Sequence, residues 1–194
     1  VEAGFSEMEQ SYQIFTKTRF KKGDQVFINY GPHSNRKLLA EYGFILPYNC
    51  HNSVKIDPKL VYEVVSKHYG HISKRKHDII RKYNLEDTYY CSPNGLSWSL
   101  ETALKILSSN ETIIQQKSLH IDSLQLSTEN ENLVRVFSKE ILKFILVGYR
   151  KDVARIWSSP DDRDDCLSER MGQLIALLKQ EMNIIQNALV SLEE

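Results

Sequence analysis

Hydrophobic and polar positions follow two different periods along the chain. Side chains of residues 12–17 alternate between the two faces expected of a β-strand, and residues 26–30 form a short apolar run. Both patterns predict β-strands. Residues 53–56 are a further short strand candidate. From residue 58 onward, apolar positions recur with helical spacing, which is typical of amphipathic helices. The pattern therefore predicts an α+β protein, with a strand-containing part over residues 1–57 and a helical part over residues 58–194.

Capping residues locate the helix boundaries. Ser34 is a suitable N-cap for a short helix that ends at Gly43, and Asp57-Pro58 is suited to begin a helix that ends at Gly70. The longest helix is predicted to start at Thr128, where Glu131 completes a capping box. The remaining helices are predicted over residues 71–83, from Ser97, and over about 163–192.

The apolar stripes of the last two helices indicate an antiparallel helix pair. A dimerising coiled coil is the less favoured alternative, because the apolar positions are not flanked by charged residues at the e and g positions of a heptad. The strand-containing part is too small to offset its ordering entropy on its own. We therefore expect its sheet to be completed by residues before Val1, by the helical region or by another chain, and we favour the first.

Composition narrows the function. The 194 residues carry 25 basic and 25 acidic side chains, so the net charge of zero argues against a generic nucleic-acid binder. No apolar run approaches the roughly 18 residues of a membrane span. The three cysteines include no CxxC pair, so neither a thiolate metal site nor a disulfide framework is indicated. We expect a protein with reduced thiols in the nucleus or cytoplasm, without direct nucleic-acid or membrane partners.

The densest signal for a functional site lies in residues 27–35, Phe-Ile-Asn-Tyr-Gly-Pro-His-Ser-Asn, and in residues 41–44, Glu-Tyr-Gly-Phe. A strand that ends at a Gly-Pro turn can present side chains to a cleft. Taken alone, the pattern favours the plainer interpretation that these aromatic side chains belong to the core.

Residues 26–44 resemble the C-terminal end of a SET methyltransferase domain, in the branch typified by Rubisco large-subunit lysine methyltransferase. The resemblance implies a catalytic position for Tyr30, which would border the channel for the target nitrogen. It implies that Tyr42, Gly43 and Phe44 line the pocket for S-adenosyl-L-methionine, with Phe44 against the adenine and no metal site. Residues 58–194 are similar to the helical substrate-binding domain of that branch.

The resemblance implies a protein-lysine N-methyltransferase that acts on a histone or another protein. The family also contains a histidine methyltransferase, so the target residue type stays open. The family's Gly-containing loop and Asn-His-Ser segment do not occur in this sequence, so we expect the cofactor site to be incomplete and this chain to be inactive alone. The alternative is a non-enzymatic helical module that binds a protein and carries an inert SET remnant.

Basic residues gather over residues 67–82, where the sequence also has three histidines. The histidines lack a carboxylate or cysteine that would complete a metal site. The cluster is most simply a solvated helix face, and the functional alternative is a docking surface for an acidic protein or a nucleosome.

Overall fold

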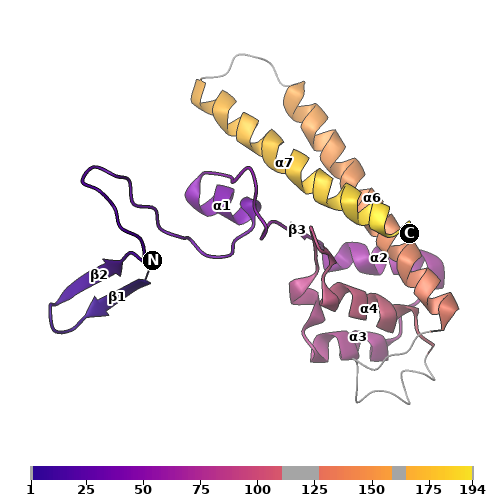
Figure 1. Ribbon diagram of the computed structural model, residues 1–194. Coiled ribbons are helices and arrows are strands. Elements are labelled where there is room, and N and C mark those ends of the chain that lie inside the picture. The colour runs from indigo at the N-terminus through magenta and orange to yellow at the C-terminus, as the bar shows by residue number, and fades with distance from the viewer. Residues whose placement is uncertain (1, 111–126, 159–164, 194) are drawn as a thin grey trace. The chain divides into compact units, whose positions relative to one another are not determined.

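The computed structural model describes residues 2–110, 127–158 and 165–193 (Figure 1). The chain forms two compact units, residues 1–33 and residues 34–194. The first unit contains a small antiparallel sheet, and the second contains every described helix and a second small sheet. This mixture of helices and short antiparallel strands confirms the expected α+β class.

The first unit is a β-hairpin followed by an extended segment. Strand β1 (Glu2–Ser6) pairs antiparallel with β2 (Ser11–Phe15), so that Phe5 lies opposite Tyr12. The strand predicted from the alternation at residues 12–17 is therefore present. The strand predicted over residues 26–30 is wrong: this run is neither strand nor helix. A strand requires a neighbour for its backbone hydrogen bonds, and no described strand pairs with these residues.

Apolar side chains of the first unit remain exposed. Among residues 3–33, whose burial is described, none is buried. Tyr12 is 68% exposed and Phe27 is 71% exposed. This agrees with the expectation that the segment buries too little apolar surface by itself. The assignment of residues 1–57 and 58–194 to two domains stays a prediction, and the compact units divide at a different point, between His33 and Ser34.

The second unit begins with α1 (Asn35–Tyr42), whose two ends confirm the predicted caps. The Ser34 side chain accepts a hydrogen bond from the Lys37 backbone N–H, and Gly43 ends the helix in the left-handed conformation. Asp57 caps α2 in the same way, and Pro58 occupies its first turn. The second unit's other elements are β3 (Val54–Lys55), α2 (Pro58–Tyr69), α3 (Lys74–Lys82), the 3₁₀ helix η1 (Leu85–Thr88), β4 (Tyr90–Ser92), β5 (Gly95–Leu96), α4 (Trp98–Ser108), α6 (Thr128–Trp157) and α7 (Asp165–Ser191).

Helix α6 begins at Thr128, as predicted, but its capping residue differs from the expected one. Ser127 caps α6 and accepts a hydrogen bond from the Asn130 N–H, so the capping box expected between Thr128 and Glu131 does not form. The serine lies one residue earlier and takes the cap position itself. The expected start of the last helix at about residue 163 lies outside the described residues, and its described part begins at Asp165.

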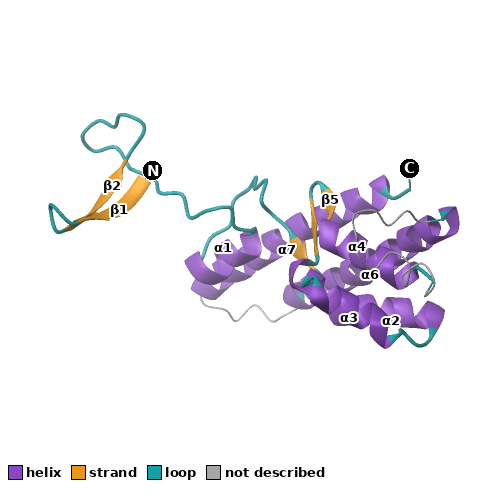
Figure 2. Ribbon diagram, turned by 90° about the horizontal axis from the view of Figure 1, so that it is seen from below, coloured by secondary structure: helices purple, strands orange, loops and turns teal. Residues whose placement is uncertain are grey.

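A small antiparallel sheet, in the order β3-β4-β5, lies against α7 (Figure 2). The strand expected at residues 53–56 is therefore present as β3. Residues 92–95 form the tight turn of a hairpin between β4 and β5. Gly95, with a φ of 107°, provides the left-handed conformation that this turn requires.

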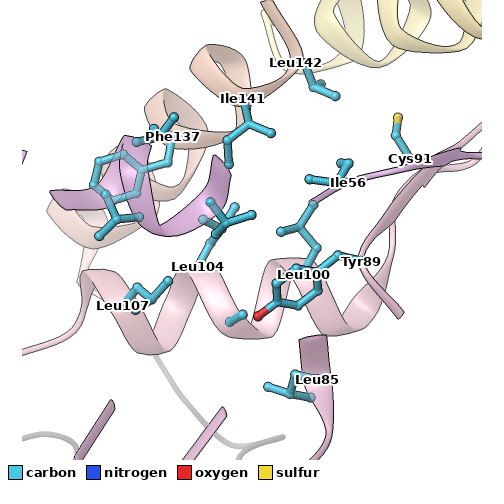
Figure 3. Close-up of a cluster of buried hydrophobic side chains, with 14 of the residues drawn as sticks. Ile56, Leu85, Tyr89, Cys91, Leu100, Leu104, Leu107, Phe137, Ile141 and Leu142 are labelled. Atoms are coloured by element: carbon cyan, nitrogen blue, oxygen red, sulfur yellow. The ribbon is translucent and has the colours of Figure 1, made fainter. Parts of the chain in front are cut away.

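The core lies around α4, which α3, η1 and α6 contact, and α2 packs against α6. Figure 3 shows its side chains, which come from α4, α6, η1 and the small sheet. Helices α6 and α7 run side by side in opposite directions, as the apolar stripes predicted (Figure 1). No helix among the described residues is long and apolar enough to cross a membrane. The largest fully buried side chains include Leu85, Tyr89, Leu100, Leu104, Phe137 and Ile141.

Candidate cofactor-binding site

Three of the four residues implicated by the SET resemblance lie at the C-terminal end of α1. Gly43 has φ 79° and ψ 16°, and its N–H donates to the Leu39 carbonyl oxygen at 3.1 Å. Apart from its two neighbours in the chain, no described residue has an atom within 4 Å of the position that a Cβ on Gly43 would occupy. Glycine is therefore favoured here by backbone conformation rather than by lack of space.

The aromatic side chains on either side of Gly43 do not belong to the core. Tyr42 is 42% exposed and Phe44 is half-buried. The plainer interpretation of these residues as core aromatics therefore does not hold for Tyr42. The left-handed turn between the two residues redirects the chain directly after α1, so both side chains remain accessible at the end of the helix.

A pocket of about 470 Å³ opens beside this turn. Its walls come from the end of α1 and from the first half of α7. A glycine backbone, apolar side chains and one guanidinium group suit a ligand that combines an apolar part with an anionic group. The lining residues are Leu39, Gly43, Arg170, Gln173 and Leu174.

An ion pair joins α1 to α7. Arg36 donates from Nε to Glu181 Oε1 at 3.0 Å and from Nη2 to Glu181 Oε2 at 2.5 Å. The Glu181 side chain is 0% exposed, whereas that of Arg36 is 48% exposed. Arg36 also donates to the hydroxyl oxygen of Tyr149 on α6 at 3.2 Å. These contacts fix the beginning of α1 on both long helices.

The hydrogen bond and charge of Glu181 raise the pKa of Arg36, against the opposing effect of burial. Burial raises the pKa of Tyr149, and the nearby Glu181 carboxylate adds to this effect. The guanidinium therefore stays charged and the phenol stays neutral through the physiological range. The ion pair is accordingly intact at neutral pH.

Asn35 forms a second connection between the same elements. Its side chain is fully buried and makes several hydrogen bonds. The amide nitrogen Nδ2 donates to the Leu46 carbonyl at 2.7 Å and to Gln180 Oε1 at 2.5 Å, while Oδ1 accepts from the Leu46 N–H at 3.2 Å. Asn35 also donates its backbone N–H to Asn52 Oδ1 at 3.0 Å. The loop after α1 is thus tied to α1 and to α7 through one side chain.

We call the set Asn35, Arg36, Tyr149, Gln180 and Glu181 the α1 clamp. Sequence reasoning missed all five residues. The local signal was slight, since an Asn-Arg pair after a capping serine is unremarkable, and the partners of Arg36 lie 113 and 145 positions away. The clamp holds α1 on α7, and these two helices form the walls of the pocket beside Gly43.

Tyr30, the fourth implicated residue, belongs to the first unit, and its side chain is 42% exposed. It lies in the extended segment rather than at the end of a strand. The core interpretation therefore fails for Tyr30 as well. The roles that the resemblance implies for Tyr30, Tyr42, Gly43 and Phe44 stay predictions.

Two other sequence candidates have ordinary structural positions. His68 lies 2.9 Å from Glu140 through Nε2, and its ring packs against Phe137. His77 packs on the ring of Tyr62, with 4.5 Å between ring centroids. Within the described part of the chain, no group of three or more histidine, cysteine or acidic residues could hold a metal ion.

No protein-family model matches the chain. It is 27% identical over 184 residues to SET domain-containing protein 4 from Artemia parthenogenetica, an alignment that covers 95% of this chain and 44% of that protein. It is 36% identical over 107 residues to the human protein of the same name, covering 55% of this chain and 24% of the human protein. It is also 30% identical over 94 residues to ribosomal lysine N-methyltransferase set11 from Schizosaccharomyces pombe, covering 48% of this chain and 22% of set11.

These similarities confirm the relationship to SET-domain proteins that residues 26–44 indicated. The chain is similar to SET domain-containing protein 4 over nearly all of its own length. It spans less than half of the length of each of these curated relatives.

Proposed function

We propose that the chain is part of an S-adenosyl-L-methionine-dependent protein-lysine N-methyltransferase. The observation that carries this proposal is the similarity to SET domain-containing protein 4, which extends over 184 residues. The similarity to a protein named as a ribosomal lysine N-methyltransferase supports the same chemistry. The proposed substrate is a lysine of a histone or of another protein, in the nucleus or cytoplasm.

Tyr42, Gly43 and Phe44 are proposed to line the cofactor pocket. The accessible aromatic side chains around Gly43 and the adjoining pocket of about 470 Å³ support this assignment. S-adenosyl-L-methionine supplies a methyl group on a sulfonium when it is bound. The α1 clamp would keep the cofactor-lining residues in place, since it fixes the helix that ends at Gly43.

Tyr30 is proposed to border the channel that admits the target amine. Only about 0.04% of free lysine is neutral at pH 7, which costs roughly 4.6 kcal/mol before the amine can attack. A narrow aromatic channel disfavours the ammonium by desolvation, and the tyrosine hydroxyl can align the lone pair of the amine. The proposed contribution of Tyr30 is therefore positioning at the reacting nitrogen rather than removal of the proton.

The chain is proposed to be inactive on its own. No side chain among residues 3–33 is buried, so the segment that contains Tyr30 presents its apolar residues to solvent. A half-formed cofactor site would bind S-adenosyl-L-methionine weakly, because few groups would surround the ligand.

Calorimetric titration with S-adenosyl-L-methionine tests this proposal on two proteins: the present chain and a form extended at its N-terminus. We expect saturable binding and methylation of a lysine-containing protein only for the extended form. Tyr30→Phe should lower its rate or alter its product distribution, whereas Tyr48→Phe, at a residue that is 96% exposed, should change neither. Tight binding by the short chain would contradict its proposed inactivity, and an extended form that neither binds nor methylates would contradict the enzyme assignment.

The second candidate is a non-enzymatic module in which the helical unit binds a protein. The observation that favours it is the distribution of buried residues. Among the described residues, all the buried ones lie in the unit formed by residues 34–194. Failure of the extended form in both assays would favour this candidate.

A further inference from the structure

Four cations of α3 lie on one face of the helix. Lys74 and Arg75 are followed two turns later by Arg81 and Lys82, and all four are exposed. Seven residues span about 10 Å along a helix axis, so the two pairs are separated by that distance. We call these four residues the α3 cationic face.

The structure separates these residues from the other basic side chains of the cluster. Lys76 turns inward, where its Nζ donates to the Leu107 carbonyl at 2.8 Å and lies 5.7 Å from the centroid of the Tyr69 ring. His77 packs on Tyr62. Lys76 and His77 are therefore withdrawn from the surface of α3, whereas the α3 cationic face remains exposed.

The charge of this face is not balanced by ion pairs within the described part of the chain. None of its four residues forms an ion pair with a described residue. Asp78 occupies the same side of α3, one turn from Lys74 and from Arg81, and it forms no ion pair with either. The face thus retains an excess of three positive charges, although the whole chain has no net charge.

Two of these cations also occupy an unfavourable position. Lys74 and Arg75 lie in the first turn of α3, which contains no acidic residue. The helix dipole places partial positive charge at this end, so cations there lower helix stability and anions raise it. A bound acidic group would relieve this repulsion as well as that between neighbouring cations.

The overall charge favours a polypeptide over a nucleic acid as the partner. The chain has no net charge, whereas a nucleic-acid-binding domain typically carries a basic excess. The cationic side chains are also held close to aromatic rings: Lys82 Nζ lies 5.4 Å from the centroid of the Tyr83 ring, and Lys76 Nζ lies 5.7 Å from that of the Tyr69 ring.

We propose that the α3 cationic face docks an acidic polypeptide segment of a partner protein. An extended peptide rises about 3.3 Å per residue, so acidic side chains about three residues apart would reach the two cation pairs. Such a contact acts mainly through long-range attraction and orientation, and it weakens as salt rises. The proposal does not depend on methyltransferase activity.

Fluorescence anisotropy with a fluorescein-labelled oligoglutamate peptide tests it on the complete 194-residue chain. Lys74→Glu/Arg75→Glu should weaken peptide binding by roughly tenfold or more at low salt. The matched control is Arg150→Glu/Lys151→Glu, an adjacent and exposed Arg-Lys pair on α6 with the same change of charge. We expect the control to retain most of the binding.

Thermal unfolding provides a second measurement on the same variants. The acidic substitutions in the first turn of α3 should not lower the unfolding temperature, because they match the helix dipole. Should that variant fold poorly, Arg81→Gln/Lys82→Gln removes the second cation pair instead and should also weaken the peptide complex. Equal losses in the two charge-reversal variants, no peptide binding, or tighter binding of a labelled single-stranded RNA at the same residues would overturn the proposal.

Discussion

Arg36 and Glu181 form a two-point ion pair in which one partner is fully buried and the other is half exposed. Their separation of 145 positions makes this pair a tertiary connection between α1 and α7. The two ends of the pair are not energetically equivalent. If the carboxylate is lost, the guanidinium that remains is already in contact with water, whereas if the guanidinium is lost, the carboxylate that remains lies in a buried position without its counter-charge.

The first prediction follows from this asymmetry. Arg36→Met should lower the free energy of unfolding by about 3 kcal/mol, because it leaves a buried carboxylate without its counter-charge. Glu181→Gln should lower it by only about 1 kcal/mol, because the guanidinium that remains is half exposed. Urea unfolding of both variants at neutral pH measures the difference. Equal losses of stability for the two variants would contradict this asymmetry.

The second prediction concerns the turn that carries the proposed cofactor residues. Gly43→Ala should cost about 1–2 kcal/mol, because alanine disfavours the left-handed conformation even where there is room for its methyl group. Gly172→Ala, in the interior of α7 and equally free of clashes, should stabilise the protein by about 0.5–1 kcal/mol. Chemical denaturation of the two variants should therefore give effects of opposite sign, and a stabilising Gly43→Ala would show that the turn differs from the one described.

The third prediction concerns alkaline pH. Burial raises the pKa of Cys91 to about 12, and burial likewise raises the pKa of Tyr89. In the unfolded chain a thiol loses its proton near pH 8.5 and a phenol near pH 10. Above about pH 9 the folded state therefore holds more protons than the unfolded state, and the free energy of unfolding falls as the pH rises.

Urea unfolding at about pH 7 and about pH 10 measures this loss. Cys91→Ala is the matched control, because it removes one of the contributing groups and should lose less stability over the same interval. Stability that stays constant or rises toward pH 10 would be inconsistent with the burial of these groups.

The fourth prediction concerns the two compact units. Limited trypsin digestion should cut first within the extended segment, after the exposed residues Arg19, Lys21 or Lys22, because no packed core protects that backbone. A chain of residues 34–194 should unfold at nearly the same temperature as the 194-residue chain, since the buried core lies within it. Mass spectrometry and thermal unfolding check these outcomes, and loss of cooperative unfolding on removal of residues 1–33 would refute them.

The ends of several helices could be predicted because the capping interactions are local. Ser34 and Asp57 each bond to a backbone N–H two or three residues away, and Gly43 needs only its own backbone freedom. The cap of α6 was misplaced by one residue because Ser127 and Thr128 are chemically similar candidates. Residues 26–30 were wrongly expected to form a strand because strand pairing depends on a partner that an apolar run does not reveal.

The sequence by itself determined the α+β class, the antiparallel helix pair, the left-handed turn at Gly43 and the resemblance to SET-domain proteins. These features depend on hydrophobic periodicity, on backbone preferences and on short motifs, all of which act over a few residues. Only the tertiary structure decided that Arg36 meets Glu181, that Asn35 meets Gln180 and that α3 turns Lys76 inward. Those relationships depend on how distant segments pack, and one sequence carries no local signal for the side chain that a buried carboxylate or amide will meet.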